Sequence, residues 1–209
     1  MAASLPRAGS YRRRHLLPMA LLVIVLAVAS LLTWIVVFAN STSQSVTSCN
    51  PPPSGGGTVQ PRTALDRTEA AAPANTAVRV LNGAGQRGQA QLAAVELGEL
   101  GMPEAAQPDN DPLYPAQDLE CVGQIRYSDD GASAARTLSL VLPCAELVDD
   151  GRQGAAVDLA LGSEFRDITP GAGVGDALKA LARGGESGTP VPGTEPAELS
   201  TLRDVDCSQ

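Results

Sequence analysis

The chain has 209 residues, of which 44% are apolar, 21 are glycine and 16 are proline, and this composition indicates one folded domain with loose appendages. Its formal net charge is −8, and the 11 basic against 23 acidic residues after residue 15 give that part a charge of −12. An acidic surface of this kind repels phosphate-rich polymers, which counts against nucleic acid or teichoic-acid-like ligands held mainly by charge.

Residues 16–39 form an apolar run without a charged side chain. As a helix rising about 1.5 Å per residue, this run reaches about 36 Å, enough to cross a hydrocarbon core of about 30 Å. Four arginines and no acid lie before it, so the positive-inside rule keeps residues 1–15 in the cytoplasm and exports the rest. We therefore predict a single-pass protein of the cell membrane with an extracytoplasmic C-terminal part.

Two alternatives concern processing of this segment. A signal peptidase site is present at residues 27–29, but the apolar run continues to Phe38 and exceeds the roughly 7 to 15 residues of a signal-peptide core. A lipoprotein is the other alternative, because residues 46–49 resemble a lipobox. The polar residues 40–44 separate that box from the apolar run, so an uncleaved anchor is favoured.

The chain after the anchor divides into three parts. Residues 40–75 are rich in Pro, Gly, Ser and Thr and predict a stalk. Residues 76–168 predict a folded domain, and residues 169–209 a last helix followed by a mobile tail. The expected elements are a strand at 77–81, a helix at 86–100, a weak strand at 104–107, a strand at 122–127, a helix between 128 and 143, a strand at 156–161 and a helix at 173–183. This order predicts a small two-layer α/β domain with a mixed sheet and two to three helices.

The stretch VRVLNGAGQRGQA at residues 78–90 contains the G-x-G-x-x-G spacing that cradles dinucleotide pyrophosphates. A dinucleotide fold also needs an acid about 20 residues further on, at the end of the second strand. The nearest acids of that kind lie 46 and 47 residues after Gly83, and NAD is not expected outside the cell. We therefore interpret Gly83 as part of a tight turn, and Gly85 and Gly88 as sites where the helix packs closely on the sheet.

Catalytic and metal-binding residues are scarce. The sole histidine, His15, lies at the cytoplasmic membrane edge, so the exported part has no imidazole for a triad or a metal. The acid pairs at 129–130 and 149–150 are interpreted as caps and solvated loops. Residues 109–111 resemble a calcium loop but lack its following Gly and Glu. We predict a protein without enzymatic activity, metal or cofactor.

All four cysteines follow the apolar run, and an even number in an oxidising compartment predicts two disulfides. Sequence alone allows three pairings. A strand followed by a returning helix brings the strand's start and the helix's end to one end of the domain, which favours a Cys121–Cys144 disulfide. Cys49 and Cys207 would then pair and join the stalk to the tail.

Several strings in order resemble the LytR C-terminal domain family of bacterial envelope proteins, over about residues 76–168. They are the run at 78–90, a helix ending in LGM, a strand IRY before an Ala-rich helix, and the closing VDLALGSEF. CNPPP, NDPLY, CVGQIR and PCAEL are similar to actinobacterial members. The resemblance implies a membrane protein needed for envelope integrity, antibiotic tolerance and, in pathogens, virulence, without established catalytic residues. Related domains are often attached to phosphotransferases, for which the stalk leaves no room.

The expected function is therefore that of an extracytoplasmic binding or scaffolding module. A groove near Tyr114, Tyr127 and Phe165 is a candidate site for an envelope lipid or cell-wall precursor. The alternative is an interaction accessory that regulates a polymer-ligating envelope enzyme through its acidic surface.

Overall fold

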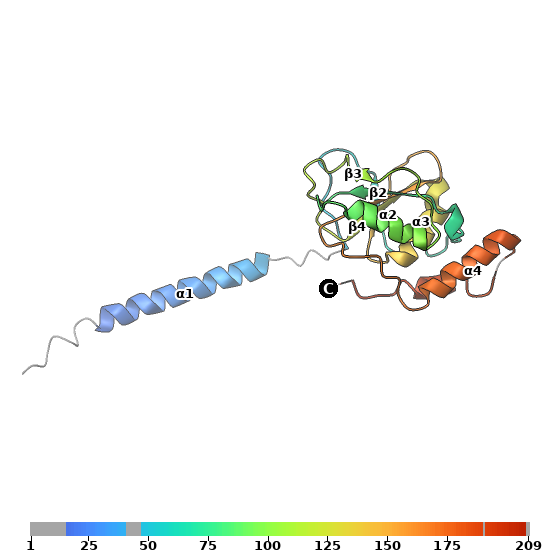
Figure 1. Ribbon diagram of the computed structural model, residues 1–209. Helices are drawn as coiled ribbons and strands as arrows, with labels where there is room; N and C mark the ends of the chain where they lie inside the picture. Colours follow the sequence, from blue (N-terminus) through green and yellow to red (C-terminus); the bar gives the residue numbers. More distant parts are fainter. Residues whose placement is uncertain (1–15, 41–46, 190, 208–209) are drawn as a thin grey trace, which may run out of the picture. The chain divides into compact units, whose positions relative to one another are not determined.

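The computed structural model describes residues 16–40, 47–189 and 191–207, and it divides the chain into two compact units, Met1–Gln44 and Ser45–Gln209. The first unit contains helix α1 (Leu16–Asn40), which covers the predicted apolar run and whose side chains are described for residues 18–33 (Figure 1). A search of the described residues finds no helix that is both long and apolar enough to cross a membrane. The membrane anchor stays a prediction.

The second unit is built around a mixed sheet, which confirms the predicted mixed α/β class, although its described residues form four α-helices rather than two to three. Within the described residues, six strands lie in the order β1-β5-β4-β6-β2-β3. They are β1 (Thr58–Gln60), β2 (Val78–Asn82), β3 (Asp109–Asn110), β4 (Gly123–Tyr127), β5 (Glu146–Asp149) and β6 (Val157–Leu161). The β4–β5, β2–β6 and β2–β3 pairs are parallel, and β1–β5 and β4–β6 are antiparallel.

Helices cover one face of this sheet (Figure 1). On that face, alternate strand side chains are apolar. The helices are α2 (Gln89–Glu99), α3 (Ala132–Val141), α4 (Val174–Ser187) and the short α5 (Pro196–Thr201), with 3₁₀ turns η1 (Pro73–Asn75) and η2 (Asp129–Gly131). The strand residues of this larger core are Val78, Val80, Ile125, Tyr127, Leu147, Val157, Leu159 and Leu161. The apolar side chains that alternate along the strands therefore pack against the apolar faces of the helices.

The ends of α2 and α3 follow from local sequence. Gly101 has φ +85°, its N–H donates to the Gly98 carbonyl, and the Met102 N–H donates to the Leu97 carbonyl. These two bonds form a Schellman motif, with Met102 and Leu97 both buried as its usual hydrophobic contact. The Ser128 hydroxyl accepts from an N–H of the turn that leads into α3, as the predicted cap requires.

The glycine motif forms the predicted strand-to-helix turn, but its three members act differently from the prediction. Gly83 makes the close approach, because a Cβ there would lie 2.8 Å from Leu119 Cδ2 and 3.0 Å from the Leu161 carbonyl oxygen. Gly85 and Gly88 have φ of +72° and +80°, which favours glycine. A Cβ at Gly88 would meet nothing within 4 Å, so the close-packing role predicted for Gly88 is wrong.

Two segments expected to be loose belong to the folded unit. Strand β1 and the core residue Leu65 lie in the predicted stalk, so residues 58–75 are part of the domain. Helix α5 lies in the predicted mobile tail, and its Leu199 is fully buried in the same core. Each segment contributes at most three buried side chains, too few for a periodic pattern in the sequence.

The predicted disulfide pairing is wrong, because the structure joins Cys49 to Cys121 and Cys144 to Cys207. Strands β4 and β5 are parallel neighbours, so Cys121 and Cys144 do precede strands at the same edge. However, Cys121 packs in a smaller cluster on the sheet face without the helices, whereas Cys144 precedes Ala145 of the larger core. Proximity at one end of the sheet therefore did not decide the pairing, because Cys49 packs against Cys121 and Cys207 against Cys144.

Candidate functional site

The three aromatic residues of the predicted groove are core residues, and that prediction is wrong. Tyr114 is completely buried in the smaller cluster, with Leu81, Leu119, Cys121 and Ala160. Tyr127 and Phe165, each 6% exposed, lie in the larger cluster under the helices. The sheet lies between Tyr114 and the other two, and none of the three lines the pockets described below.

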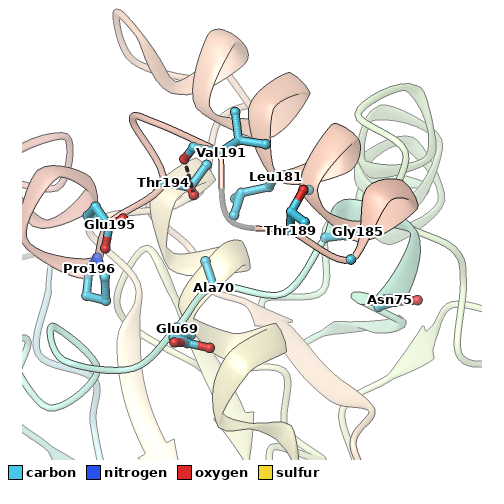
Figure 2. A pocket seen from close by; sticks show the side chains of 13 residues that line it. Glu69, Ala70, Asn75, Leu181, Gly185, Thr189, Val191, Thr194, Glu195 and Pro196 are labelled. Atoms are coloured by element: carbon cyan, nitrogen blue, oxygen red, sulfur yellow. Dashed lines mark hydrogen bonds between the residues drawn. The ribbon is translucent and has the colours of Figure 1, made fainter.

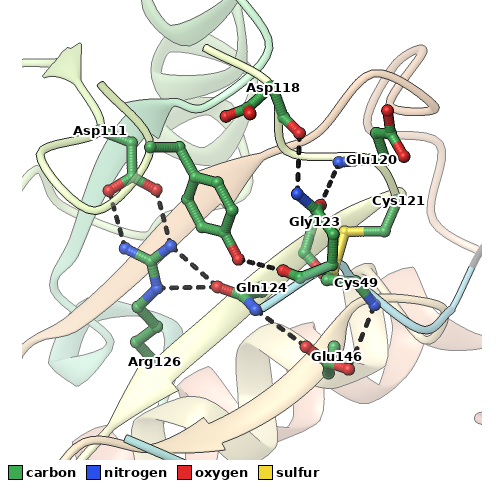
Figure 3. Close-up of a disulfide and its surroundings, with 11 residues drawn as sticks. Cys49, Asp111, Asp118, Glu120, Cys121, Gly123, Gln124, Arg126 and Glu146 are labelled. Atoms are coloured by element: carbon green, nitrogen blue, oxygen red, sulfur yellow. Dashed lines mark hydrogen bonds and ion pairs between the residues drawn. A yellow bond between two sulfur atoms is a disulfide. The ribbon is translucent and has the colours of Figure 1, made fainter. Parts of the chain in front are cut away.

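The sheet face without the helices carries a buried hydrogen-bond network beside the Cys49–Cys121 disulfide (Figure 3). Arg126, 2% exposed, donates to both carboxylate oxygens of Asp111, at 2.9 and 2.6 Å, and to the Gln124 side chain. Gln124 in turn donates to Glu146, whose other oxygen accepts from the Cys49 N–H at 3.2 Å. The polar face of β4 thus connects a loop carboxylate to the disulfide.

Asn50 fastens the segment next to that disulfide onto the same face. Its side-chain amide donates to the Asp118 carbonyl and accepts from the Glu120 N–H, at 3.0 and 2.7 Å. The Tyr114 hydroxyl donates to the Asn50 carbonyl. Every one of these groups has a structural partner, so we assign this network to holding residues 47–57 rather than to chemistry.

The acids singled out in the sequence have structural partners or lie at turns. Asp111 of the calcium-like segment binds a guanidinium group, an arrangement that does not suit a cation. Asp149 and Asp150 accept from backbone N–H groups two residues on, and the exposed pair at 129–130 lies in the first turn of η2. The described residues contain no group of three or more His, Cys, Asp or Glu placed to hold a metal.

A second ion-pair network crosses β2 and β6. The Asp158 carboxylate accepts from Arg79 at 2.8 Å and lies 2.8 Å from Arg152, which also binds Asp150. Burial alone opposes ionisation of Asp158, but the two arginines outweigh it and hold the pKa of this carboxyl below its ordinary value.

One pocket of about 330 Å³ lies between the C-terminal half of α4 and two flanking segments (Figure 2). Ala70, Leu181 and Val191 provide apolar side chains, and Glu69, Thr189 and Glu195 lie at its polar parts. Gly185 allows α4 to approach the segment that contains Ala72, since a Cβ at Gly185 would lie 2.6 Å from Ala72 Cβ. This mixture of apolar and polar lining is typical of sites for amphipathic ligands.

Another pocket, of about 410 Å³, lies where the segment after β1 meets the C-terminal segment. Its lining residues are Arg62, Thr63, Asp66, Ser200, Thr201, Arg203 and Asp204. Sequence reasoning missed both pockets because their walls come from segments that it interpreted as stalk and tail. The only signal for this one was the presence of arginines in those two Pro/Gly-rich segments.

Fold, disulfides and polar network together define a small disulfide-bonded α/β domain, and comparison with known proteins identifies its family. Residues 75–165 match the family model LytR_C, described as LytR cell envelope-related transcriptional attenuator. The chain belongs to this LytR C-terminal family. It is 34% identical over 205 residues to the cell envelope integrity protein Cei of Mycobacterium tuberculosis (strain ATCC 25618 / H37Rv), covering 93% of this chain and 90% of that protein.

A solved structure also matches. The crystal structure of the soluble domain of a conserved hypothetical secreted protein from Mycobacterium marinum has a TM-score of 0.65 and 34% identity, covering 72% of this chain and 98% of that chain. The matched piece is described as a soluble domain, and residues 45–209 form one compact unit here. The family match stops at residue 165, so both pockets depend on residues outside it.

Proposed function

We propose that the protein is a non-catalytic envelope-integrity factor, anchored by residues 16–39 with its folded domain on the extracytoplasmic side. The observation that carries this proposal is the similarity to Cei over 93% of the chain. Two disulfides in the folded unit suit an exported domain, because such bonds persist in oxidising compartments. We extend the proposed role to tolerance of antibiotics and, in pathogenic bacteria, to virulence.

The chemistry of the domain supports a binding role over catalysis. Asp111 and Asp158 are buried carboxylates, and both are bonded to guanidinium groups, which suits permanent charge partners rather than proton donors. Within the described residues, no cysteine is free to act as a nucleophile. A binding module therefore accounts for the available groups better than an enzyme does.

The pocket between α4 and residues 69–75 is our proposed contact site for an envelope lipid or cell-wall precursor. Leu181 and Val191 offer apolar surface to a chain, while Glu69 and Glu195 offer hydrogen-bond acceptors to a polar head. The alternative is an accessory that regulates a polymer-ligating envelope enzyme. The charge of −12 after residue 15 favours this role, because an acidic surface is complementary to a basic surface on a partner protein.

Complementation of a deletion strain tests this proposal. Full-length chain restores tolerance of detergent and cell-wall antibiotics, whereas Asn75→Trp, which places an indole at the exposed rim of the α4 pocket, does not. Ala74→Trp is the matched control, because Ala74 is exposed next to Asn75 and does not line the pocket. Equal restoration by both variants would remove the pocket from the proposal, and no phenotype in the deletion strain would remove the envelope role.

Crosslinking in cells separates the two classes of partner. We expect lipid or cell-wall precursor to co-purify with the full chain and to be lost with Asn75→Trp. If the chain instead captures a polymer-ligating enzyme, and Asn75→Trp captures the same amount of it, the accessory role is supported.

A further inference from the structure

Two arginines bind one carboxylate beside the second pocket, and a third arginine is bonded to one of the two. The Arg136 and Arg203 guanidinium groups both donate to Asp66 Oδ1, at 3.2 and 3.0 Å. Arg136 is completely buried and Arg203 is 5% exposed, whereas Arg62 is exposed. Asp204, the other acid of the pocket, is also exposed. Arg62 and Arg203 balance Asp66 and Asp204 in the pocket lining, so the buried Arg136 charge next to Asp66 leaves a positive excess at this point of an otherwise acidic domain.

The buried part of this cluster is not fully neutralised. Two guanidinium groups share a single carboxylate oxygen, and the Nε atoms of Arg136 and Arg203 have no hydrogen-bond partner. Burial lowers the pKa of both arginines, and for Arg203 the nearby Arg136 charge lowers the pKa further. Because arginine stays protonated in proteins, the fold carries the cost of a buried positive charge that lacks its own counter-ion.

The cluster is held in place before any ligand arrives. Arg203 donates to the Arg62 carbonyl at 2.8 Å, and Arg62 donates to the carbonyls of Arg203 and Pro143 at 3.3 Å. The Cys144–Cys207 disulfide ties the C-terminal segment next to the same point. A ligand would therefore lose little of its binding free energy to ordering of this pocket.

We propose that this pocket binds a single small oxyanion, the phosphate or carboxylate group of a larger ligand. Arg62 and Arg203 supply planar donor groups that match such oxygens, and Thr63 lines the same space. The acidic remainder of the domain disfavours a polyanion, so one isolated group is the ligand class that fits. The inference gives a ligand chemistry to the proposed binding module and rests on that proposed function for its cellular setting.

Calorimetry on purified residues 45–209 at constant ionic strength tests the site. The probes are inorganic phosphate, acetate and dihexanoyl phosphatidic acid below its micelle concentration. We expect saturable binding of at least one probe, weakened about tenfold by Arg62→Gln, which removes a charged donor that is exposed and not part of the core. Arg67→Gln is the matched control, because Arg67 is exposed on the same segment but does not line the pocket.

The probes also separate the sources of the group. Equal affinity for phosphate and phosphatidic acid assigns the site to the phosphate alone, and tighter binding of phosphatidic acid assigns it to a lipid headgroup. Absence of saturable binding for all three probes would overturn the proposal. Binding that Arg62→Gln leaves intact, or that Arg67→Gln weakens equally, would overturn it too. Melting curves confirm folding of both variants, and the complementation test of the envelope role does not depend on these results.

Discussion

Gly83 shows how a single residue of the nucleotide-like motif serves the fold. Its N–H donates to the Leu161 carbonyl at 2.9 Å and its carbonyl accepts from the Leu119 N–H at 3.0 Å. These bonds hold the turn after β2 against the end of β6 and the loop before β4. The absent side chain leaves the space that Leu119 occupies, so the residue is required for packing rather than for a phosphate.

Replacement of Gly83 by valine should lower the free energy of unfolding by about 3 kcal/mol, because the new side chain overlaps Leu119 and the Leu161 carbonyl. Urea denaturation of residues 45–209 measures the loss. Gly98→Ala is the control, since Gly98 lies in α2 with open space around it and should gain up to about 1 kcal/mol. A Gly83→Val domain as stable as the wild type would contradict the packing role.

Asp158 links stability to pH. The pKa of this carboxyl is lower in the folded state than the unfolded value of about 3.9, so its ionised form stabilises the fold above that pH. The contribution is lost as the pH falls from about 4 through the folded-state pKa. Asp158→Asn should therefore cost about 1.5 to 3 kcal/mol at pH 7, and the difference from wild type should shrink below about pH 4.

Urea unfolding from pH 7 to pH 2 measures this difference. Asp130→Asn, which removes an exposed carboxylate from η2, is the matched control and should cost less than about 0.5 kcal/mol at pH 7. A constant gap between wild type and Asp158→Asn over the whole range would rule out this role of the carboxylate.

At the scale of elements, the C-terminal helix is structural despite its short length. Leu199 of α5 is fully buried, and Ser200 accepts from Arg136 at 2.9 Å. The Arg136 guanidinium also donates to the Pro196 carbonyl. Helix α5 therefore covers a buried charge on α3, and the disulfide to Cys207 keeps it there.

Removal of that disulfide by Cys144→Ala with Cys207→Ala should destabilise the domain by about 4 kcal/mol, on a loop-closure estimate for a separation of 63 residues. Hydrogen exchange should show lost protection first in residues 196–203. The Cys49→Ala, Cys121→Ala pair is the comparison, because its loop of similar length lies on the other sheet face. Unchanged protection of α5 in the first variant would mean that the disulfide does not hold it.

For the whole molecule, the charge is divided between its ends. Residues 1–15 contain four arginines and no acid, and the part after the apolar helix carries a charge of −12. In our proposal this asymmetry sets the orientation, with the arginines retained in the cytoplasm and the acidic domain exported.

Fractionation of cells tests that arrangement. Full-length protein should remain in the membrane pellet after an alkaline carbonate wash, and protease added to spheroplasts should digest its domain. A chain beginning at Ser45, exported behind a cleavable signal peptide, should be recovered in the soluble fraction. Full-length protein in the soluble fraction, or a domain protected from external protease, would contradict the proposed anchor.

Elements with a strong local pattern were predictable from the sequence. The apolar stripes of α2, α3 and α4 and the alternation in β6 appear where they were expected, since each pattern lies within one short segment. Strand β5 was missed, because four residues between a helix and a loop give too little periodicity. The predicted ligand groove was wrong. The sequence shows that Tyr114, Tyr127 and Phe165 are present, but it does not show whether their rings face a cavity or the core.

The sequence by itself determined the family, the mixed α/β class and the presence of two disulfides, because these depend on ordered local strings and on composition. Only the tertiary structure decided which cysteines pair, which acids bind Arg126 and Arg79, and that Arg136 and Arg203 share Asp66 while Arg203 is bonded to Arg62. Those contacts join residues far apart in the chain across two faces of one sheet. Pairing across a sheet depends on which face each segment covers, and no local pattern in this sequence encodes that choice.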